Sequence, residues 1–226
     1  MARPLDARLV TADRIRVKLG LLFIALLLSV GCSGQRIAPK YPTAVIVAFT
    51  DGFHSGVMVP RQFVPIDLLP PTYGEALRWP WVVLHFGERH WIRGEADSMW
   101  DAVRLSLATG DGGVQIDLTP SLIHACGGTR PEHVRVWVFP VTQRELTELL
   151  TRFRSWTTVG VQQELIGPTT GWWPSTRHWS LPNNCHDFTA DLLAGAGIQL
   201  PRPPIMSAWG LADALDDAWV MSEGSR

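Results

Sequence analysis

Charged side chains are scarce in this sequence. Only 18% of its 226 residues are charged, whereas 46% are hydrophobic. Disordered chains combine low hydrophobicity with high charge, so this composition excludes a disordered protein. The length fits a single domain, because about 100–200 residues build one hydrophobic core.

The sequence also lacks an excess of basic residues. The first 31 positions hold five of the 20 Lys and Arg residues and two of the 21 Asp and Glu residues. The other 195 positions therefore carry 15 basic and 19 acidic side chains, a net charge near −4. Binding to a nucleic-acid backbone depends on cations that neutralise phosphates, so we expect no nucleic-acid partner.

No metal or cofactor is expected either. The three cysteines form no C-x-x-C pair, and no H-x-x-x-H spacing occurs, although structural zinc sites need several ligands at such spacings. Cys185, His186 and Asp187 are consecutive, so their side chains point in different directions. His186 is expected to be solvent-exposed or to support a site without contacting its ligand.

The apolar run at 19–30 holds 12 residues, fewer than the roughly 20 that a membrane-spanning helix needs. It follows a basic segment, which is typical of a signal peptide, here residues 1–31. The next residues, Ser29-Val30-Gly31-Cys32, resemble a bacterial lipobox, in which Cys32 receives lipid. Residues 32–43 then form a tether. This interpretation places the protein in the bacterial cell envelope, anchored to the periplasmic face of the inner or outer membrane. Ordinary secretory cleavage beside an unrelated cysteine is the alternative.

Periodicity in residues 44–226 predicts one α+β domain with an antiparallel sheet. Thr142 and Glu145 form a capping box, and Asn184 is a suitable N-cap for the helix that Gly197 ends. The expected strands cover 44–49, 54–59, 81–86, 89–92, 114–118 and 134–139. The expected helices cover 98–108, 143–156, 185–196 and 208–218, with an irregular loop at 160–183.

Two segments contain residues suited to nucleophilic catalysis. His54 follows the Asp51-Gly52 turn at the start of a strand, and Cys185 occupies the first turn of an apolar helix. The partial positive charge of a helix N-terminus favours a thiolate, and its N–H groups can hold a developing oxyanion. Cys185 and His54 together suit acyl chemistry. Each also has an ordinary structural explanation, since cysteines are often buried as small apolar residues and histidines often form hydrogen bonds.

The order of these segments resembles that of circularly permuted papain-like proteins, including NlpC-related lipoproteins, lecithin retinol acyltransferase relatives and PPPDE-type isopeptidases. More closely, the chain resembles the bacterial domain-of-unknown-function family 2459. That family's G-W-H-T-G and N-T-C-N-T-W-T-A motifs correspond to Gly52–Gly56 and Asn183–Ala190, and its W-G-D-R-x-F-Y segment corresponds, with changes, to 86–92. The resemblance implies an antiparallel sheet packed against a helix with the catalytic Cys185 at its N-terminus.

In papain-like sites, a polar residue on the strand after the histidine strand orients the imidazole. The resemblance therefore implies an orienting residue near the third motif. His85 is the first choice and Glu88 the second, because Glu88 stands where the family usually has Asp.

Aromatic residues precede Cys185 in the loop. They either wall a substrate-binding groove by stacking or simply anchor the loop. These residues are Trp172, Trp173, His178 and Trp179.

The leading functional hypothesis is a lipid-anchored thiol hydrolase of the amidase or peptidase type. Cys185 attacks an amide or ester carbonyl and His54 transfers the proton. An envelope location suggests peptidoglycan peptides, glycopeptides or acyl groups as substrates. The alternatives are an acyltransferase of the same fold and a non-catalytic binding module. A disulfide between Cys126 and Cys185, which export would permit, would exclude catalysis.

Overall fold

The computed structural model describes residues 42–70, 76, 78–92, 101, 110–125, 133–158, 161, 163–200 and 207–223. These residues belong to a compact unit, Gly34–Arg226, that is separate from Met1–Ser33. The expected signal peptide, Cys32 and most of the tether lie outside the described residues, as do Cys126 and nearly all of the helix expected at 98–108.

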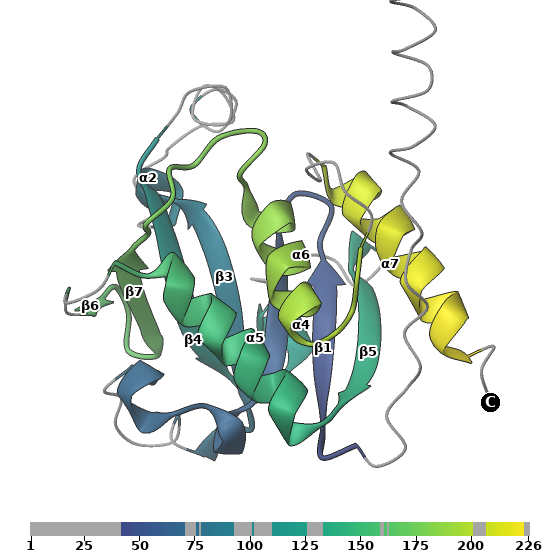
Figure 1. Cartoon of the computed structure of the whole chain (residues 1–226). Helices are drawn as coiled ribbons and strands as arrows, with labels where there is room; N and C mark the ends of the chain where they lie inside the picture. The colour runs from purple at the N-terminus through teal and green to yellow at the C-terminus, as the bar shows by residue number, and fades with distance from the viewer. Residues whose placement is uncertain are drawn as a thin grey trace, which may run out of the picture. The chain divides into compact units, whose positions relative to one another are not determined.

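A seven-stranded sheet forms the centre of this unit (Figure 1). Its strands are β1 (Ala44–Thr50), β2 (Ser55–Pro60), β3 (Trp81–Glu88), β4 (Gly112–Thr119), β5 (Arg135–Val141), β6 (Glu164–Leu165) and β7 (Thr170–Pro174). The strand order is β5-β1-β2-β3-β4-β7-β6, and every neighbouring pair is antiparallel. The predicted α+β class with an antiparallel sheet is confirmed.

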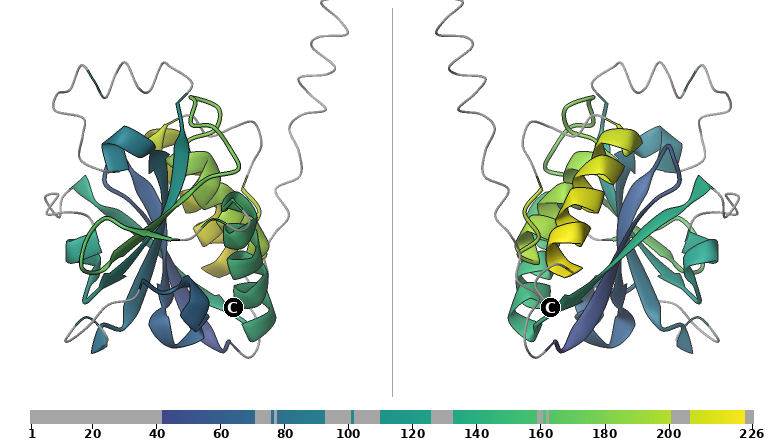
Figure 2. Two further views of the ribbon diagram at one scale, coloured as in Figure 1. Left: turned by 90° about the vertical axis from the view of Figure 1, so that its left-hand side faces the viewer. Right: turned by 90° about the vertical axis from the view of Figure 1, so that its right-hand side faces the viewer.

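Three helices cover one face of the sheet (Figure 2). They are α5 (Gln143–Trp156), α6 (Cys185–Gly195) and α7 (Ala208–Glu223). Side chains alternate between the faces of a strand, so Val57, Leu84 and Ile116 point to this helix face and join its core. Phe153 of α5 and Phe188 of α6 pack into the same core.

The opposite face of the sheet has a smaller apolar cluster of Val47, Phe49, Met58 and Val83. The short helix α4 (Leu122–Ala125) packs against this cluster through its partly buried Leu122 and Ala125. This second face is less covered by apolar side chains, which leaves room for polar residues on it.

The expected helix signals are present where the sequence places them. The side chain of Thr142 accepts a hydrogen bond from the Glu145 amide, and the Glu145 carboxylate accepts one from the Thr142 amide, which completes the capping box of α5. Asn184 caps α6, and Gly197 follows it with a φ of +74°, a conformation that glycine adopts at little cost.

Two segments differ from the prediction. Residues 89–92 form the short helix α2 (Arg89–Ile92) instead of a strand, because the pairing of β3 with β4 ends at Glu88. The predicted loop at 160–183 contains β6 and β7, because the aromatic residues at 172 and 173 extend the sheet beyond β4. The segment that follows β2 forms two 3-10 turns, η1 (Arg61–Phe63) and η2 (Ile66–Leu68).

Antiparallel pairing brings several strand ends together at one end of the sheet. The ends of β1, β3 and β7 lie there, together with the starts of β2 and β4. The start of α6 lies at the same end, beside the turn that joins β1 to β2 (Figure 1). Within the described ranges, no helix combines the length and apolarity needed to cross a membrane.

Candidate active site

The turn between β1 and β2 positions His54. Gly52 has a φ of +93°, which favours glycine at this position. The carboxylate of Asp51 accepts hydrogen bonds from the amides of Phe53 and His54, at 3.1 and 2.7 Å. The Asp-Gly sequence therefore fixes the backbone immediately before His54.

Ser55 links this turn to the start of α6. Its Oγ lies 3.0 Å from Oγ1 of Thr189 and 3.0 Å from Nδ1 of His186, both on α6. Ser55 also favours a lower pKa of the Cys185 thiol, against the larger effect of burial. The residue that follows His54 is therefore hydrogen-bonded to the first turn of α6, which begins with Cys185.

The other neighbour of His54 is His85. Nε2 of His54 lies 2.7 Å from Nδ1 of His85, and the two ring centroids are 4.8 Å apart. Gly56 makes this approach possible, because a Cβ at that position would lie 3.0 Å from Nδ1 of His85. Phe49 packs its ring edge against His85 from the same face of the sheet. His85 is thus the ring that contacts His54, and its role as the orienting residue stays a prediction.

Asp117 lies on the far side of His85. Its Oδ2 is 3.5 Å from Nε2 of His85, and it accepts hydrogen bonds from the side chains of Gln115 and Thr170. An acceptor at this place favours a proton on Nε2 of His85 and leaves Nδ1 to accept the proton of His54 Nε2. With this assignment, Nδ1 of His54 remains available to accept a proton.

Burial keeps both imidazoles neutral. It lowers the pKa of His54 to about 3, assisted by His85 and opposed by Asp51 and Asp117. Burial also lowers the pKa of His85 to about 4, against the effects of Asp51 and the Ser55 backbone. The pKa of Asp117 is raised by burial and lowered again, in part, by its two hydrogen-bond donors.

The Cys185 thiol is also neutral in this structure, contrary to the expectation of a thiolate. The residue is only 2% exposed, and burial raises its thiol pKa to about 11. The hydrogen bonds from Ser55 and from the Cys185 backbone oppose this shift without cancelling it. Desolvation therefore outweighs the helix N-terminus here.

His186 is buried, so of the two expectations for it, an exposed residue or a supporting one, the exposed one is wrong. Sγ of Cys185 lies 3.8 Å from its Nδ1 and 3.9 Å from its Nε2. Nearly equal distances mean that the sulfur is aligned with neither in-plane lone pair. Burial, followed by His54, lowers the pKa of His186 to about 4. Because Ser55 also engages Nδ1, His186 supports the site and is poorly placed as its base.

Glu88, the second choice as orienting residue, lies three residues from His85 and so points to the other face of β3. The residue is 3% exposed, and its Oε1 is 2.8 Å from Nδ1 of His90. The structure therefore does not bring Glu88 into the set formed by His54, His85 and Asp117.

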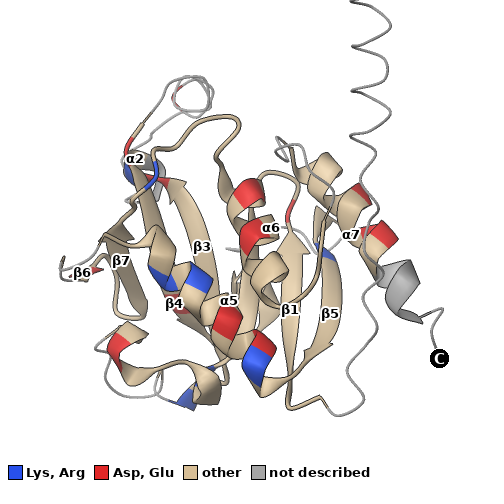
Figure 3. Cartoon of the chain, viewed as in Figure 1, with Lys and Arg blue, Asp and Glu red and all other residues tan. Residues whose placement is uncertain are grey.

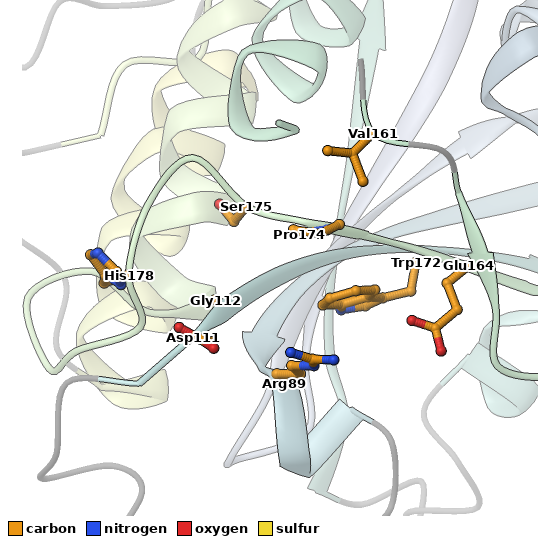
Figure 4. Close-up of a pocket in the computed structure, with 9 residues that line it drawn as sticks. All are labelled: Arg89, Asp111, Gly112, Val161, Glu164, Trp172, Pro174, Ser175 and His178. Carbon is orange, nitrogen blue, oxygen red and sulfur yellow. The ribbon is translucent and has the colours of Figure 1, made fainter. Parts of the chain in front are cut away.

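The four aromatic candidates separate into two groups. Trp173 packs on Phe153 in the core, and Trp179 lies 5.7 Å, centroid to centroid, from Phe86. Trp172 and His178 instead line a pocket of about 340 Å³, shown in Figure 4, whose lining does not include Cys185.

Comparisons with protein-family models, with curated proteins and with solved structures found no match to this chain. Among the described residues, no group of three or more His, Cys, Asp or Glu side chains is arranged to hold a metal ion.

Sequence reasoning missed Ser55 and Asp117. The sequence carries a signal for each: Ser55 follows His54 directly, and Asp117 is an acidic residue between the apolar Ile116 and Leu118 of an expected strand.

Proposed function

We propose that the protein is a thiol hydrolase in which Cys185 is the nucleophile and His54 the general base. The observation that carries this proposal is the 2.7 Å contact between His54 and His85 at the sheet end where α6 begins with Cys185. We infer that His54 and Cys185 meet at this end of the sheet during the reaction, because acyl-transfer chemistry requires a thiol nucleophile and a base that a second polar group orients. The resemblance to permuted papain-like proteins supports the same assignment.

The proposed reaction has two stages. Sγ of Cys185 bonds to the carbonyl carbon of an amide or ester while its proton passes to Nδ1 of His54. The proton then moves to the leaving group as the bond between that group and the carbonyl carbon breaks. Water next attacks the thioester and gives a proton to His54, the C–S bond breaks, and the acid product leaves the restored thiol.

The resting thiol and imidazole are both neutral, so the proton moves during attack instead of beforehand. His85 and Asp117 hold the imidazole in the tautomer that can accept this proton. In the first turn of α6, the amides of His186 and Asp187 already donate to Asn184. The Cys185 amide is therefore the first-turn donor proposed to face the oxyanion.

Trapping of an acyl-enzyme tests this function. The full chain is mixed with 4-nitrophenyl acetate, and intact-protein and peptide mass spectrometry measure the rate at which Cys185 gains an acetyl group. We expect His54→Ala to lower this rate by about 10²–10⁴-fold. Cys126→Ser is the matched control and should retain it. If Cys185 gains no acetyl group, or if His54→Ala leaves the rate unchanged, the binding-module alternative replaces the hydrolase.

We also propose export and lipid attachment at Cys32, based on residues 14–32. The substrates would then be peptides, glycopeptides or acylated molecules of the bacterial envelope. Labelling of cells with a fatty acid should mark the wild-type chain and not a Cys32→Ala variant. Equal labelling of the two chains would disprove the attachment site.

A further inference from the structure

Asp117 lies inside a strand, which sets it apart from the other charged residues of this sheet. The remaining Asp, Glu, Lys and Arg residues of the seven strands are Glu88, Arg135 and Glu164, and each occupies a strand end. In Figure 3, most charged positions accordingly lie on the helices and loops, whereas the strands are largely uncharged. A carboxylate at an inner strand position loses part of its hydration, so it needs polar partners.

Thr170, the first residue of β7, supplies one of these partners. It is paired directly with Asp117 across the two antiparallel strands, and its Oγ1 donates a hydrogen bond to Oδ1 of Asp117. Nε2 of Gln115 donates to the other oxygen, Oδ2, at 2.5 Å. Opposite side chains of a strand pair share a face and lie close enough to interact. The strand β7, which the sequence did not predict, thus provides a ligand for the carboxylate.

The two donors fix the orientation of the carboxylate. Each of its oxygens has a donor, so the group cannot rotate without losing a hydrogen bond. Oδ2 is held in this way 3.5 Å from Nε2 of His85, whose Nδ1 lies 2.7 Å from Nε2 of His54. A continuous set of polar contacts therefore runs from Thr170 at the start of β7 through Asp117 and His85 to His54.

Thr170 also favours the charged form of Asp117. Burial raises the pKa of this carboxyl group, and the hydrogen bond from Thr170 lowers it, followed by the one from Gln115 and by the charge of a protonated His54. A charged carboxylate only accepts hydrogen bonds, so it favours the proton on Nε2 of His85. A protonated Asp117 could donate instead, which would move the imidazole proton to Nδ1 of His85. Nδ1 of His54 would then carry a proton and could no longer act as the base.

Other titratable groups lie around this set of contacts. Arg89 and His90 belong to α2, which contacts β4, while His124 lies on α4, beyond the other end of β4, and Glu164 lies on β6. Asp51, in the turn before His54, raises the pKa values of both imidazoles against the larger effect of burial. A pH profile therefore reports on Asp117 when a substitution at its partner is compared with the same substitution elsewhere on the sheet.

We propose that Thr170 is a positioning residue for the proposed reaction. It holds the Asp117 carboxylate so that His85, and through it His54, stays in the tautomer that accepts the thiol proton. Thr170 acts through these residues and contacts neither the thiol nor the substrate. This inference rests on the proposed hydrolase, because it assigns Thr170 a part in the same proton transfer.

The pH profile of acyl-enzyme formation tests this role. Acetylation of Cys185 in the full chain by 4-nitrophenyl acetate is measured between pH 4 and 8. Thr170→Val keeps the shape of the side chain and removes the hydroxyl. We expect the acidic limb of its profile to move upward by about one pH unit, because loss of a hydrogen bond to the carboxylate favours the protonated acid.

Two variants serve as controls. Thr170→Ser retains the hydroxyl and should restore the wild-type profile. Thr119→Val removes the hydrogen bond from Thr119 to the Ser121 backbone, at the end of β4 away from the site, and should also keep the wild-type profile. Circular dichroism confirms that each variant is folded.

NMR of the imidazole nitrogens gives a readout that does not depend on Cys185. At pH 6 we expect the His85 proton on Nε2 in the wild type and a larger share of it on Nδ1 in Thr170→Val. An unchanged His85 tautomer in Thr170→Val would overturn the inference. Acetylation that requires His54 and keeps its pH profile in Thr170→Val would refute the positioning role alone. A changed tautomer in a chain whose Cys185 is never acetylated would refute the hydrolase and support the link from Thr170 to His85.

Discussion

Cys185 should react slowly with alkylating reagents in the folded protein. Burial raises the thiol pKa from the ordinary 9.0 to about 11. At pH 7, about one thiol in 10⁴ is then ionised, compared with about one in 10² for an ordinary cysteine, and the thiolate is the reactive form. We therefore expect about 100-fold slower alkylation than in the unfolded chain. The 2% exposure of Cys185 slows the reaction further.

His54→Ala should leave this alkylation nearly unchanged. The pKa of His54 is lowered to about 3, so no imidazolium is present at neutral pH to stabilise a thiolate. The same substitution should strongly slow acyl-enzyme formation, which requires a proton acceptor during attack. This difference separates a general base from a permanent thiolate–imidazolium pair.

The assay measures iodoacetamide labelling of the Cys185 peptide by mass spectrometry between pH 6 and 11. The same peptide in the urea-unfolded chain is the reference. Labelling should rise with pH through the whole range without reaching a plateau below pH 10. A plateau near pH 8, or slowing of more than about 10-fold in His54→Ala, would show an activated thiolate and refute the neutral pair.

Further predictions follow from the surroundings of the site. Gly56→Ala should lower acetylation of Cys185 with an unchanged circular dichroism spectrum, since its methyl group would displace the His85 ring. Asp117→Asn should slow acetylation about 10-fold without slowing alkylation, because it alters the His85 tautomer. Burial lowers the pKa values of His85 and His186 from 6.5 to about 4, which stabilises the fold above pH 6.5. This contribution is lost as the pH falls toward 4, so urea titrations should show up to about 1.4 kcal/mol less stability per histidine and pH unit. Thr142→Ala should cost about 1 kcal/mol in the same assay, because it removes the cap of α5.

Local signals in the sequence were sufficient for much of the fold. Thr142 and Asn184 mark helix starts through hydrogen bonds that span only two or three residues, so neighbouring residues decide them. The strand at 170–174 was missed because its glycine and proline suggested a loop. Its pairing with β4, 50 or more residues away, determines its conformation.

The candidate site could be predicted only in part for the same reason. Local signals place both His54 and Cys185. His54 follows the Asp51-Gly52 turn, and Cys185 follows the N-cap residue Asn184. The role of Asp117 depends on the register of β3 with β4, which places it near His85. The state of the thiol depends on burial by residues distant in the sequence, so the helix-start argument alone gave the wrong direction for the Cys185 pKa.

The segment His54-Ser55-Gly56 joins the two faces of the sheet. Ser55 points to the helix face, where it contacts His186 and Thr189 of α6. His54 contacts His85 on the opposite face, and Gly56 makes room for that ring. Successive residues of a strand alternate between faces, so a shift of β2 by one residue would exchange these positions and disrupt both sets of contacts. The register of β2 with its two neighbours is therefore the feature on which the proposed site depends.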